Sequence, residues 1–292
     1  MQICFKMAEV IETHKVGTIP PKTRIYDYLP GKLTVITTRK GIKKALQNGL
    51  VLINKKRAKS GDYIKAGDQI DLLQKEISPN KIYKTKIHVE YEDEYLAVVH
   101  KPAGLVVSGN RFKTLHNALP YNLTESKEHD ALPWPLPIHR LDGPTSGLVI
   151  IAKTYSCRVA LGEMIEQRRI HKGYEAIIQG KLSCYGLLNT NVQGKEAMTK
   201  FQSIEVIPNL RNDFVTRIKL WPITGRRHQL RIHLSRLGYP IMGDQTYGKK
   251  GNILLKKGLF LAATEVAFKH PKTGVKIEVT IPAPLKFKRF NL

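Results

Sequence analysis

The stretch from Ile138 to Thr154 constrains the fold more than any other part of the chain. Its first half is a polar loop that holds Asp142 and a Gly143–Pro144 turn, and its second half is the apolar run Leu148–Ala152. A short run rich in Val and Ile between turn residues is typical of a buried strand. Proline fixes its own φ and restricts the residue before it, and Gly147 lets the chain enter the strand without a Cβ clash. The stretch therefore predicts a carboxylate held on a rigid turn at the start of a buried strand.

An aspartate in such a turn usually caps the turn, and Arg140 would then pair with it on the surface. The surrounding residues favour another role. Residues 139–147 read HRLDGPTSG, which resembles the active-site signature of the RluA-type pseudouridine synthases. Two further blocks of that family follow in the expected order, at Lys172–Gly180 and Ile223–Gly248. The resemblance extends over about residues 22–284, most of the chain.

A fourth block of the family, Leu96–Val107, contains the sequence K-P-A-G. Directly after it the chain departs from the family, because it has Ser108–Arg111 where many relatives have His-Pro. Substrate contacts made by that loop are therefore not carried over. The resemblance implies an α+β catalytic domain with a mixed, largely antiparallel β-sheet, flanking helices and a cleft across the sheet. It also implies that the chain is an enzyme that isomerises uridine in RNA.

The implied reaction breaks the bond between ribose and N1 of uracil, turns the base, and joins it again through C5. No oxidation state changes and no group is added, so no cofactor is expected. A carboxylate can act as a nucleophile toward the ribose or the base, or as a base that removes a ribose proton, and the sequence leaves both open. The resemblance assigns this carboxylate to Asp142 and its ion-pair partner to Arg231. A guanidinium is charged at every working pH, which suits a buried ion pair.

The resemblance also assigns roles to residues around the base. The ring of Tyr174 would pack on uracil and its hydroxyl would accept the proton released from C5, although plain packing is the alternative for a tyrosine at the start of a strand. Leu230 would form an apolar wall beside the base. Arg140 would fill the stack left when the nucleotide turns out of the RNA. His139 is placed near the substrate but is expected to satisfy a backbone group of the loop.

The chain contains 48 Lys and Arg against 24 Asp and Glu, a formal net charge of +24. Self-repulsion of this size indicates a polyanionic partner, which on charge alone is RNA, DNA or an anionic membrane. No apolar run approaches the ~20 residues of a membrane-spanning helix, and the N-terminus lacks a secretory apolar core, so we expect a cytoplasmic protein. Without a long heptad repeat we expect a monomer. Cys4, Cys157 and Cys184 are too few and too dispersed for a disulfide framework and are expected to pack in the core.

The first quarter of the chain has its own pattern of expected helices and strands. A short helix at Arg24–Leu29 is followed by a helix that begins at Thr38, a strand at Leu50–Asn54, a basic turn, and a strand at Gln69–Leu73. This order resembles the alpha-L RNA-binding module, which is often fused in front of RluA-type enzymes. A solvated helix face is the alternative for its cations. Those expected to bind RNA phosphates are Arg39, Lys40, Lys43, Lys44, Lys55, Lys56 and Arg57.

The chain is therefore predicted to comprise a lead-in at 1–21, an alpha-L domain at 22–75, a linker at 76–86 and a catalytic domain at 87–292. The lead-in is expected to be extended, either as irregular chain or as an edge strand. In the catalytic domain we expect two helices, at 156–167 and 228–237. Strands are expected at 87–91, 95–100, 147–152, 174–180, 200–207, 215–221, 259–269 and 275–281.

Two alternatives to this function remain. His228 and His233, with Asp244 after them, could belong to a metal nuclease, but zinc helices place two histidines four residues apart, and a spacing of five turns the second by about 140°. No metal is therefore expected, and Arg226 and Arg227 are expected to contact phosphate at the positive end of the helix. The other alternative is an inactive RNA-binding factor for ribosome assembly. As substrate we expect large-subunit ribosomal RNA first and transfer RNA second.

Overall fold

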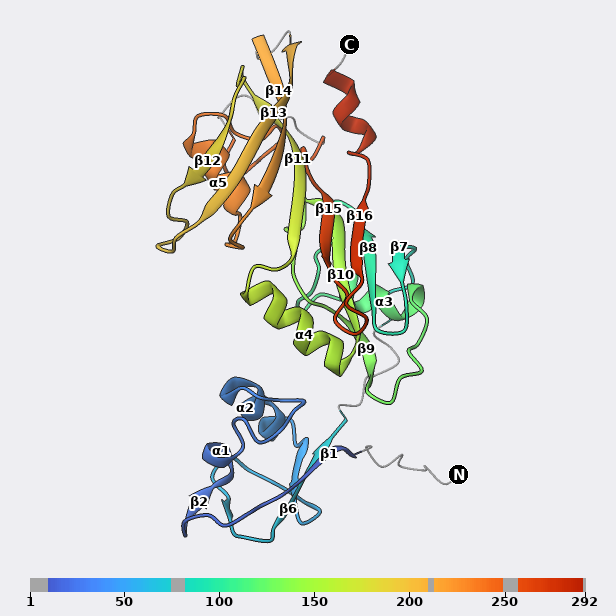
Figure 1. The fold of residues 1–292 in the computed structure, drawn as a ribbon, viewed down its shortest axis with the longest axis vertical. Coiled ribbons are helices and arrows are strands. Elements are labelled where there is room, and N and C mark those ends of the chain that lie inside the picture. The colour runs from blue at the N-terminus through green and yellow to red at the C-terminus, as the bar shows by residue number, and fades with distance from the viewer. Residues whose placement is uncertain (1–9, 75–81, 210–212, 249–256, 291–292) are drawn as a thin grey trace. The chain divides into compact units, whose positions relative to one another are not determined.

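The computed structural model of the chain describes residues 10–74, 82–209, 213–248 and 257–290. They belong to two compact units that divide between Ser78 and Pro79 (Figure 1). Cys4 and the part of the expected linker at 76–81 lie outside the described residues. Within the described ranges, no helix is both long enough and apolar enough to cross a membrane.

The N-terminal unit is a small α/β structure around one hydrophobic cluster. Its main sheet has the strand order β1-β6-β3-β4, and a second sheet pairs β2 with β5. The edge strand β1 lies in the segment expected as a lead-in, and Val16 after it is buried in the cluster, so that segment contributes to this unit. The elements are β1 (Val10–Lys15), β2 (Thr23–Arg24), α1 (Ile25–Tyr28), α2 (Arg39–Gln47), β3 (Val51–Ile53), β4 (Lys56–Arg57), β5 (Tyr63–Ile64) and β6 (Gln69–Leu73).

Signals in the local sequence explain the helix α2 and the turn between β3 and β4, which carry positively charged residues of this unit. Thr38 caps α2, because its hydroxyl accepts a hydrogen bond from the N–H of Gly41 at 3.1 Å. Between β3 and β4, Asn54 (φ 48°) and Lys55 (φ 67°) are both left-handed, the geometry of a two-residue hairpin turn. All seven expected RNA-binding residues are exposed, and Arg39 forms an ion pair with a neighbouring acid at 3.5 Å.

The C-terminal unit is built on one ten-stranded sheet. Its main path is β12-β13-β14-β11-β15-β10-β8-β7, with β16 beside β15 and β9 beside β10. The elements are β7 (His88–Glu92), β8 (Leu96–Lys101), α3 (Leu115–Asn122), β9 (Ala131–Pro137), β10 (Ser146–Thr154), α4 (Tyr155–Glu166), β11 (His171–Gln179), β12 (Tyr185–Asn189), β13 (Met198–Asn209), β14 (Asp213–Pro222), α5 (Gln229–Arg236), β15 (Leu261–Lys269), β16 (Lys276–Thr280) and a 3-10 helix, η2 (Leu285–Phe290). The predicted α+β fold with a mixed, largely antiparallel sheet is confirmed.

One parallel contact joins the two halves of this sheet. Among the described strands, β10 and β15 pair in parallel, and the other pairs in the sheet are antiparallel. Gly147 of β10 lies opposite Ala263 of β15, and Ala263 lies opposite Tyr174 of β11 on its other side. The loop that holds Asp142 leads into this junction. The fold therefore brings Asp142 and Tyr174 toward one point of the sheet from opposite halves.

Gly147 allows the two halves to approach. Its φ is +119°, and a Cβ would lie 2.1 Å from the carbonyl oxygen of Ala263. We expect Gly147→Ala to lower the free energy of unfolding by about 3 kcal/mol, because it adds backbone strain to a backbone clash. As a control, Gly162→Ala in α4 places its Cβ where no described atom beyond its chain neighbours and the nearby helix backbone lies within 4 Å, and should raise stability by roughly 0.5–1 kcal/mol. Urea unfolding of both variants measures the difference, and equal midpoints would contradict the assignment.

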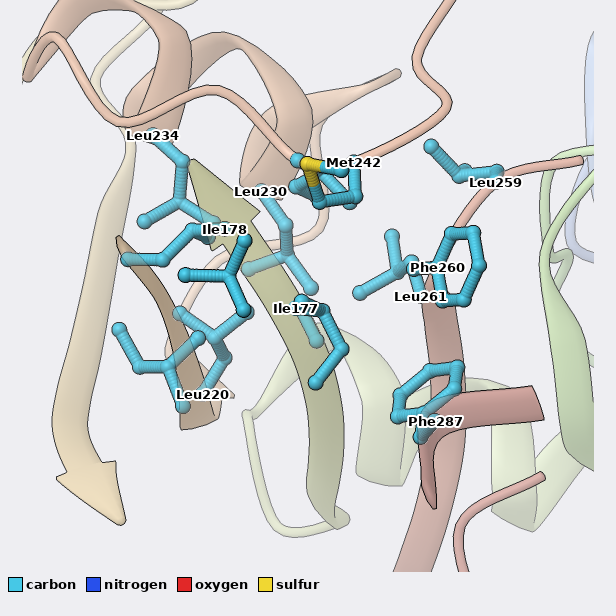
Figure 2. Packing of buried hydrophobic residues seen from close by; sticks show 14 of the residues in the cluster. Ile177, Ile178, Leu220, Leu230, Leu234, Met242, Leu259, Phe260, Leu261 and Phe287 are labelled. Carbon is cyan, nitrogen blue, oxygen red and sulfur yellow. The ribbon is translucent and has the colours of Figure 1, made fainter. Parts of the chain in front are cut away.

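A hydrophobic cluster supports α5 and the strands beside it. Figure 2 shows Leu230 and Leu234 of α5 with Ile177 of β11 and Phe260, all in this cluster. Six consecutive residues of α5, Gln229–Leu234, are buried, so its polar side chains need partners inside the protein.

Two cysteines are described, and they differ. Cys157 is buried in a hydrophobic cluster, as expected. Cys184 is exposed, which corrects the expectation that it packs in the core. It precedes the edge strand β12, where few neighbouring elements are available to cover it.

Candidate active site

Arg231 joins two carboxylates that are far apart in the sequence. Its Nε and Nη2 donate to the two oxygens of Asp244, each at 2.7 Å, and its Nη1 donates to Oδ2 of Asp142 at 3.3 Å. The side chains of Arg231, Asp244 and Asp142 are 6%, 1% and 17% exposed. The two short bonds fix the plane of the guanidinium, so its remaining edge is directed at Asp142. The structure thus brings together the two residues expected to form an ion pair.

From the sequence, Asp244 was considered only for the metal alternative, and its contact with Arg231 was not predicted. Its Oδ1 also accepts hydrogen bonds from the N–H groups of Thr246 at 2.9 Å and Tyr247 at 3.0 Å. Burial alone would raise the pKa of Asp244, but these bonds and the Arg231 guanidinium lower it. Burial likewise opposes the charge on Arg231, yet the two carboxylates raise the pKa of Arg231. Asp244 therefore holds Arg231 charged and oriented.

His228 faces the other oxygen of Asp142. Its Nε2 lies 3.6 Å from Oδ1 of Asp142, and its Nδ1 lies 3.0 Å from the hydroxyl of Tyr247. His228 has a left-handed backbone (φ 57°) and precedes α5, which corrects the expected start of that helix. Burial lowers the pKa of His228, although Asp142 opposes this effect. Asp142 thus lies between a permanent cation and an imidazole whose charged form is disfavoured by burial.

Lys101 and a turn fix the backbone around Asp142. The N–H of Thr145 donates to the carbonyl of Asp142 at 3.0 Å and closes the turn. Lys101 has no exposed surface, and its ammonium donates to backbone carbonyls that include those of Leu105 at 2.7 Å and Gly143 at 3.2 Å. Burial lowers the pKa of Lys101 to about 8. The K-P-A-G block was identified from the sequence, but its lysine was assigned no role. In the structure, Lys101 connects the loop at Leu105 to the turn at Gly143 through hydrogen bonds.

A cavity of about 370 Å³ opens beside these groups, within the usual range for small-ligand pockets. Three of the expected site residues line it: Arg140, Asp142 and Arg231. Arg140 and Arg227, which also lines it, are exposed, and no described acid forms an ion pair with either. We call this space the reaction cavity. Its other lining residues are Gly143, Pro144, His228, Gly243, Asp244, Gln245, Thr246, Gly258 and Leu259.

Tyr174 lies at the sheet junction, partly buried between two hydrophobic clusters. Burial raises the pKa of Tyr174, and the charge of Asp142 raises it further. The phenol is therefore protonated at working pH, and it is close enough to Asp142 to respond to its charge.

Four residues expected at the substrate do not line the reaction cavity: Tyr174, His139, Leu230 and Arg226. Leu230 does not line the reaction cavity, because its side chain points into the hydrophobic cluster between α5 and the sheet (Figure 2). Arg226 lines a separate cavity, and its Nε donates to the carbonyl of Glu196 at 3.1 Å, which turns the side chain away. Leu259 supplies an apolar part of the lining instead.

His139 accepts a hydrogen bond from the N–H of Ile150 at 3.1 Å, so it satisfies a backbone group as expected, although this group belongs to β10 and not to the loop. Burial lowers its pKa from 6.5 to about 3. Between these values the unfolded chain binds a proton that the folded chain does not, so stability falls as pH decreases from 6.5 to about 3. In the variant His139→Gln, the amide oxygen can accept the same hydrogen bond. The variant should lose the contribution of His139 to the slope of unfolding free energy against pH, which is at most about 1.4 kcal/mol per pH unit.

The control for this prediction is His171→Gln, at an exposed histidine. It should keep the pH slope of the parent chain. Urea unfolding of all three proteins between about pH 4 and pH 7 makes the measurement, with the pH window set by the shift of His139. Equal slopes in the His139 variant and the parent would refute the assignment.

The histidines of the metal alternative have separate partners. The imidazole of His233 contacts the hydroxyl of Thr199 at 3.0 Å and the carbonyl of Thr190 at 3.1 Å, whereas His228 faces Asp142. Another group with possible metal ligands is Glu128–Asp130. Its two carboxylates already accept hydrogen bonds, at 2.8 Å each, from the Tyr95 hydroxyl and the Ser156 N–H. Neither arrangement indicates a metal centre.

Comparison with known proteins identifies relatives over most of the chain. Residues 95–236, which include Asp142, Tyr174 and Arg231, match the family described as RNA pseudouridylate synthase. The chain is 30% identical to Ribosomal large subunit pseudouridine synthase C of Pasteurella multocida, over 91% of this chain and 88% of the relative. It is 35% identical to Dual-specificity RNA pseudouridine synthase RluA of Haemophilus influenzae, over 64% and 89%. The solved structure of Human RNA Pseudouridylate Synthase Domain Containing 1 is 25% identical, with a TM-score of 0.56 over 68% of this chain and 84% of that one.

Proposed function

This chain belongs to the RluA-type pseudouridine synthases, isomerases that act on uridine in RNA, and from that premise we propose that its substrate is large-subunit ribosomal RNA. Transfer RNA is the second candidate. The relative from Pasteurella multocida is named for the ribosomal large subunit, and the one from Haemophilus influenzae is named as having dual specificity. The net charge of +24 agrees with a polyanionic substrate. We further propose that the protein acts as a monomer in the cytoplasm.

One observation carries the proposed assignment of the active site. A guanidinium held by the buried Asp244 is directed at Asp142 on the wall of the reaction cavity. A carboxylate that is ionised and partly shielded from water can act either as a nucleophile or as a base. We assign Asp142 this role and Arg231 the role of its ion-pair partner.

The reaction then balances with groups of this chain alone. The bond from C1′ of the ribose to N1 of uracil breaks, and a new bond forms between C1′ and C5. The proton on C5 leaves, and N1 gains one. Asp142 assists the first step either by bonding to the sugar or base or by removing a ribose proton, and Arg231 stabilises the carboxylate before it reacts and when it is regenerated.

Tyr174 and Arg140 are assigned the handling of the base. The raised pKa of Tyr174 favours a neutral phenol whose ring packs on uracil. Its hydroxyl can accept the C5 proton only if it passes its own to a neighbouring base such as Asp142. Arg140 is exposed at the rim of the reaction cavity, where a planar cation can replace the everted nucleotide in the stack.

The N-terminal unit is proposed to bind RNA phosphates through its exposed cations. We expect Lys43→Gln with Lys44→Gln to weaken RNA binding and to reduce the slope of log affinity against log salt by roughly 0.7–0.9 for each phosphate that is no longer neutralised. Lys15→Gln with Lys65→Gln, at two other exposed lysines of the unit, is the matched control and should bind as the parent does. Filter binding across a salt series measures both, and equal slopes in the two double variants would contradict the proposal.

The substrate assignment is tested by mapping pseudouridine in ribosomal and transfer RNA from cells with and without this gene. Loss of a site in large-subunit ribosomal RNA is the expected result. Loss restricted to transfer RNA would support the second substrate. If the purified protein bound RNA but no site was lost, the alternative of an inactive assembly factor would replace the proposal.

A further inference from the structure

A second cavity, of about 280 Å³, lies on the C-terminal unit outside the reaction cavity. It is formed where three segments meet: the end of α4, the start of β11 and the loop after β14. None of the residues assigned to catalysis lines it. The lining residues are Ile165, Glu166, Arg168, Ile170, Lys172, Pro222, Ile223, Thr224, Gly225 and Arg226.

Lys172 is a cation in this cavity without a counter-ion. Burial lowers the pKa of Lys172. Within the described parts of the chain, no group accepts a hydrogen bond from its ammonium and no acid forms an ion pair with it. A mostly buried charge is normally paired, because removal of water from it costs free energy that a partner offsets. The cavity therefore lacks the anion that would complete it.

Two arginines add positive charge at the same place. Arg168 follows α4 with a left-handed backbone (φ 57°), is exposed, and has no acidic partner among the described residues. Arg226 is fixed through its Nε by the carbonyl of Glu196, which leaves its terminal nitrogens for a ligand. Glu166 is the one carboxylate in the lining. Three cations against one acid select for an anion.

The backbone connects this cavity to the reaction cavity. Arg226 lines the second cavity and the next residue, Arg227, lines the reaction cavity. Lys172 lies two residues before Tyr174 on β11, so the two side chains leave the strand on the same face. The charge of Lys172 also lowers the pKa of His139, which lies next to Arg140. The second cavity therefore lies beside the segments that carry Tyr174 and Arg227.

We propose that the second cavity binds a backbone phosphate of the RNA strand beside the everted uridine, with Lys172 as the main donor and Arg168 and Arg226 at the rim. The proposal rests on the proposed function, since it concerns the same substrate. A phosphate contact at this point fixes the register of the strand without reading its sequence. Lys172 and the two arginines are thus binding residues that position the target.

The first test compares Lys172→Met and Arg168→Gln with Arg169→Gln, a matched control at the adjacent exposed arginine that does not line the cavity. The probe is an in vitro transcript of the host large-subunit ribosomal RNA. Lys172→Met should weaken binding about tenfold, as expected when one charge-assisted hydrogen bond is removed, and lower the salt slope by roughly 0.7–0.9. Arg168→Gln should act in the same direction, and Arg169→Gln should match the parent.

Lys172→Arg keeps the positive charge and should bind the RNA with most of the affinity of the parent. This result would show that the weaker binding of Lys172→Met comes from the lost charge and not from damage to the fold. If Lys172→Met kept the parent salt slope, the phosphate site would be refuted whatever the activity of the enzyme. If instead the slopes changed as expected but the parent formed no pseudouridine, the proposed function would fail and the anion site would remain.

The second test identifies the phosphate. In a short RNA that spans the mapped uridine, single phosphates near the target are replaced by neutral methylphosphonates. The parent should bind about tenfold more weakly when one particular position is replaced, and Lys172→Met should be insensitive to the change at that position. Equal sensitivity of both proteins at every position would overturn the proposal.

Discussion

Replacing Arg231 with methionine is expected to lower the rate of pseudouridine formation and the stability of the fold at the same time. The substitution removes the partner of Asp244, whose side chain is 1% exposed, and leaves that charge buried without compensation. Breaking a buried pair in this way costs about 3–5 kcal/mol. Asp142 loses its cation in the same step, and removal of one charge-stabilising group typically lowers a rate by about 10²–10³-fold. Urea unfolding and pseudouridine formation on ribosomal RNA measure the two effects.

A double variant separates the two effects. Arg231→Met with Asp244→Asn removes both buried charges, and the amide oxygen can still accept bonds from the N–H groups of Thr246 and Tyr247. Most of the stability should return, because no unpaired charge remains. The rate should stay about 10²–10³-fold below that of the parent, since Asp142 still lacks its cation. Recovery of activity in the double variant would show that Arg231 acts only on the fold.

Asp142→Asn is expected to give the largest loss of rate. The amide keeps the size of the carboxylate and can still accept a bond from Nη1 of Arg231, while Asp244 holds the guanidinium in place. Stability should therefore change little. The rate should fall by about 10²–10⁴-fold if Asp142 is a general base, and by up to about 10⁶-fold if it is the nucleophile. The size of the loss would thus decide a question that the sequence left open.

The control for this prediction is Glu278→Gln, at a carboxylate that is 61% exposed and pairs with Lys276 on the surface. It removes one negative charge from the same unit and should retain the parent rate. Single-turnover pseudouridine formation at saturating RNA is the measurement. A loss below tenfold in Asp142→Asn would remove Asp142 from the chemistry.

Much of the fold was predictable because its signals are local. The apolar run before Lys153 predicted β10, and the cap at Thr38 predicted α2. Each of these depends on neighbouring residues alone. The turn at Gly143 was predictable for the same reason.

The elements that the sequence did not predict include α3, β9 and β12, whose residues disfavour the structure they adopt. The helix α3 contains Pro120, which cannot donate a backbone hydrogen bond. The strand β9 reads ALPWPLP, and prolines are tolerated there because β9 pairs with β10 alone among the described strands, off the main path. The strand β12 contains Gly186 and lies at the end of the sheet, so little apolar pattern is required of it.

The site was predictable in part. Resemblance supplied Asp142, Tyr174 and Arg231, but side-chain directions and long-range partners depend on the assembled fold. Asp244 and Lys101 act through contacts across loops that no local spacing encodes. The direction of Leu230 likewise depends on how α5 packs on the sheet, as Figure 2 shows. The contacts of these residues follow only from the folded structure.

The most direct measurement of the central claim is tritium release from ribosomal RNA labelled at C5 of uracil. Only formation of the new bond at C5 frees that tritium, so binding alone gives no signal. The parent protein should release it, and Asp142→Asn should bind the same RNA and release it at least about a hundredfold more slowly. Release by Asp142→Asn at the parent rate, or none from the parent, would contradict the claim that the Asp142 carboxylate, held by Arg231, isomerises uridine.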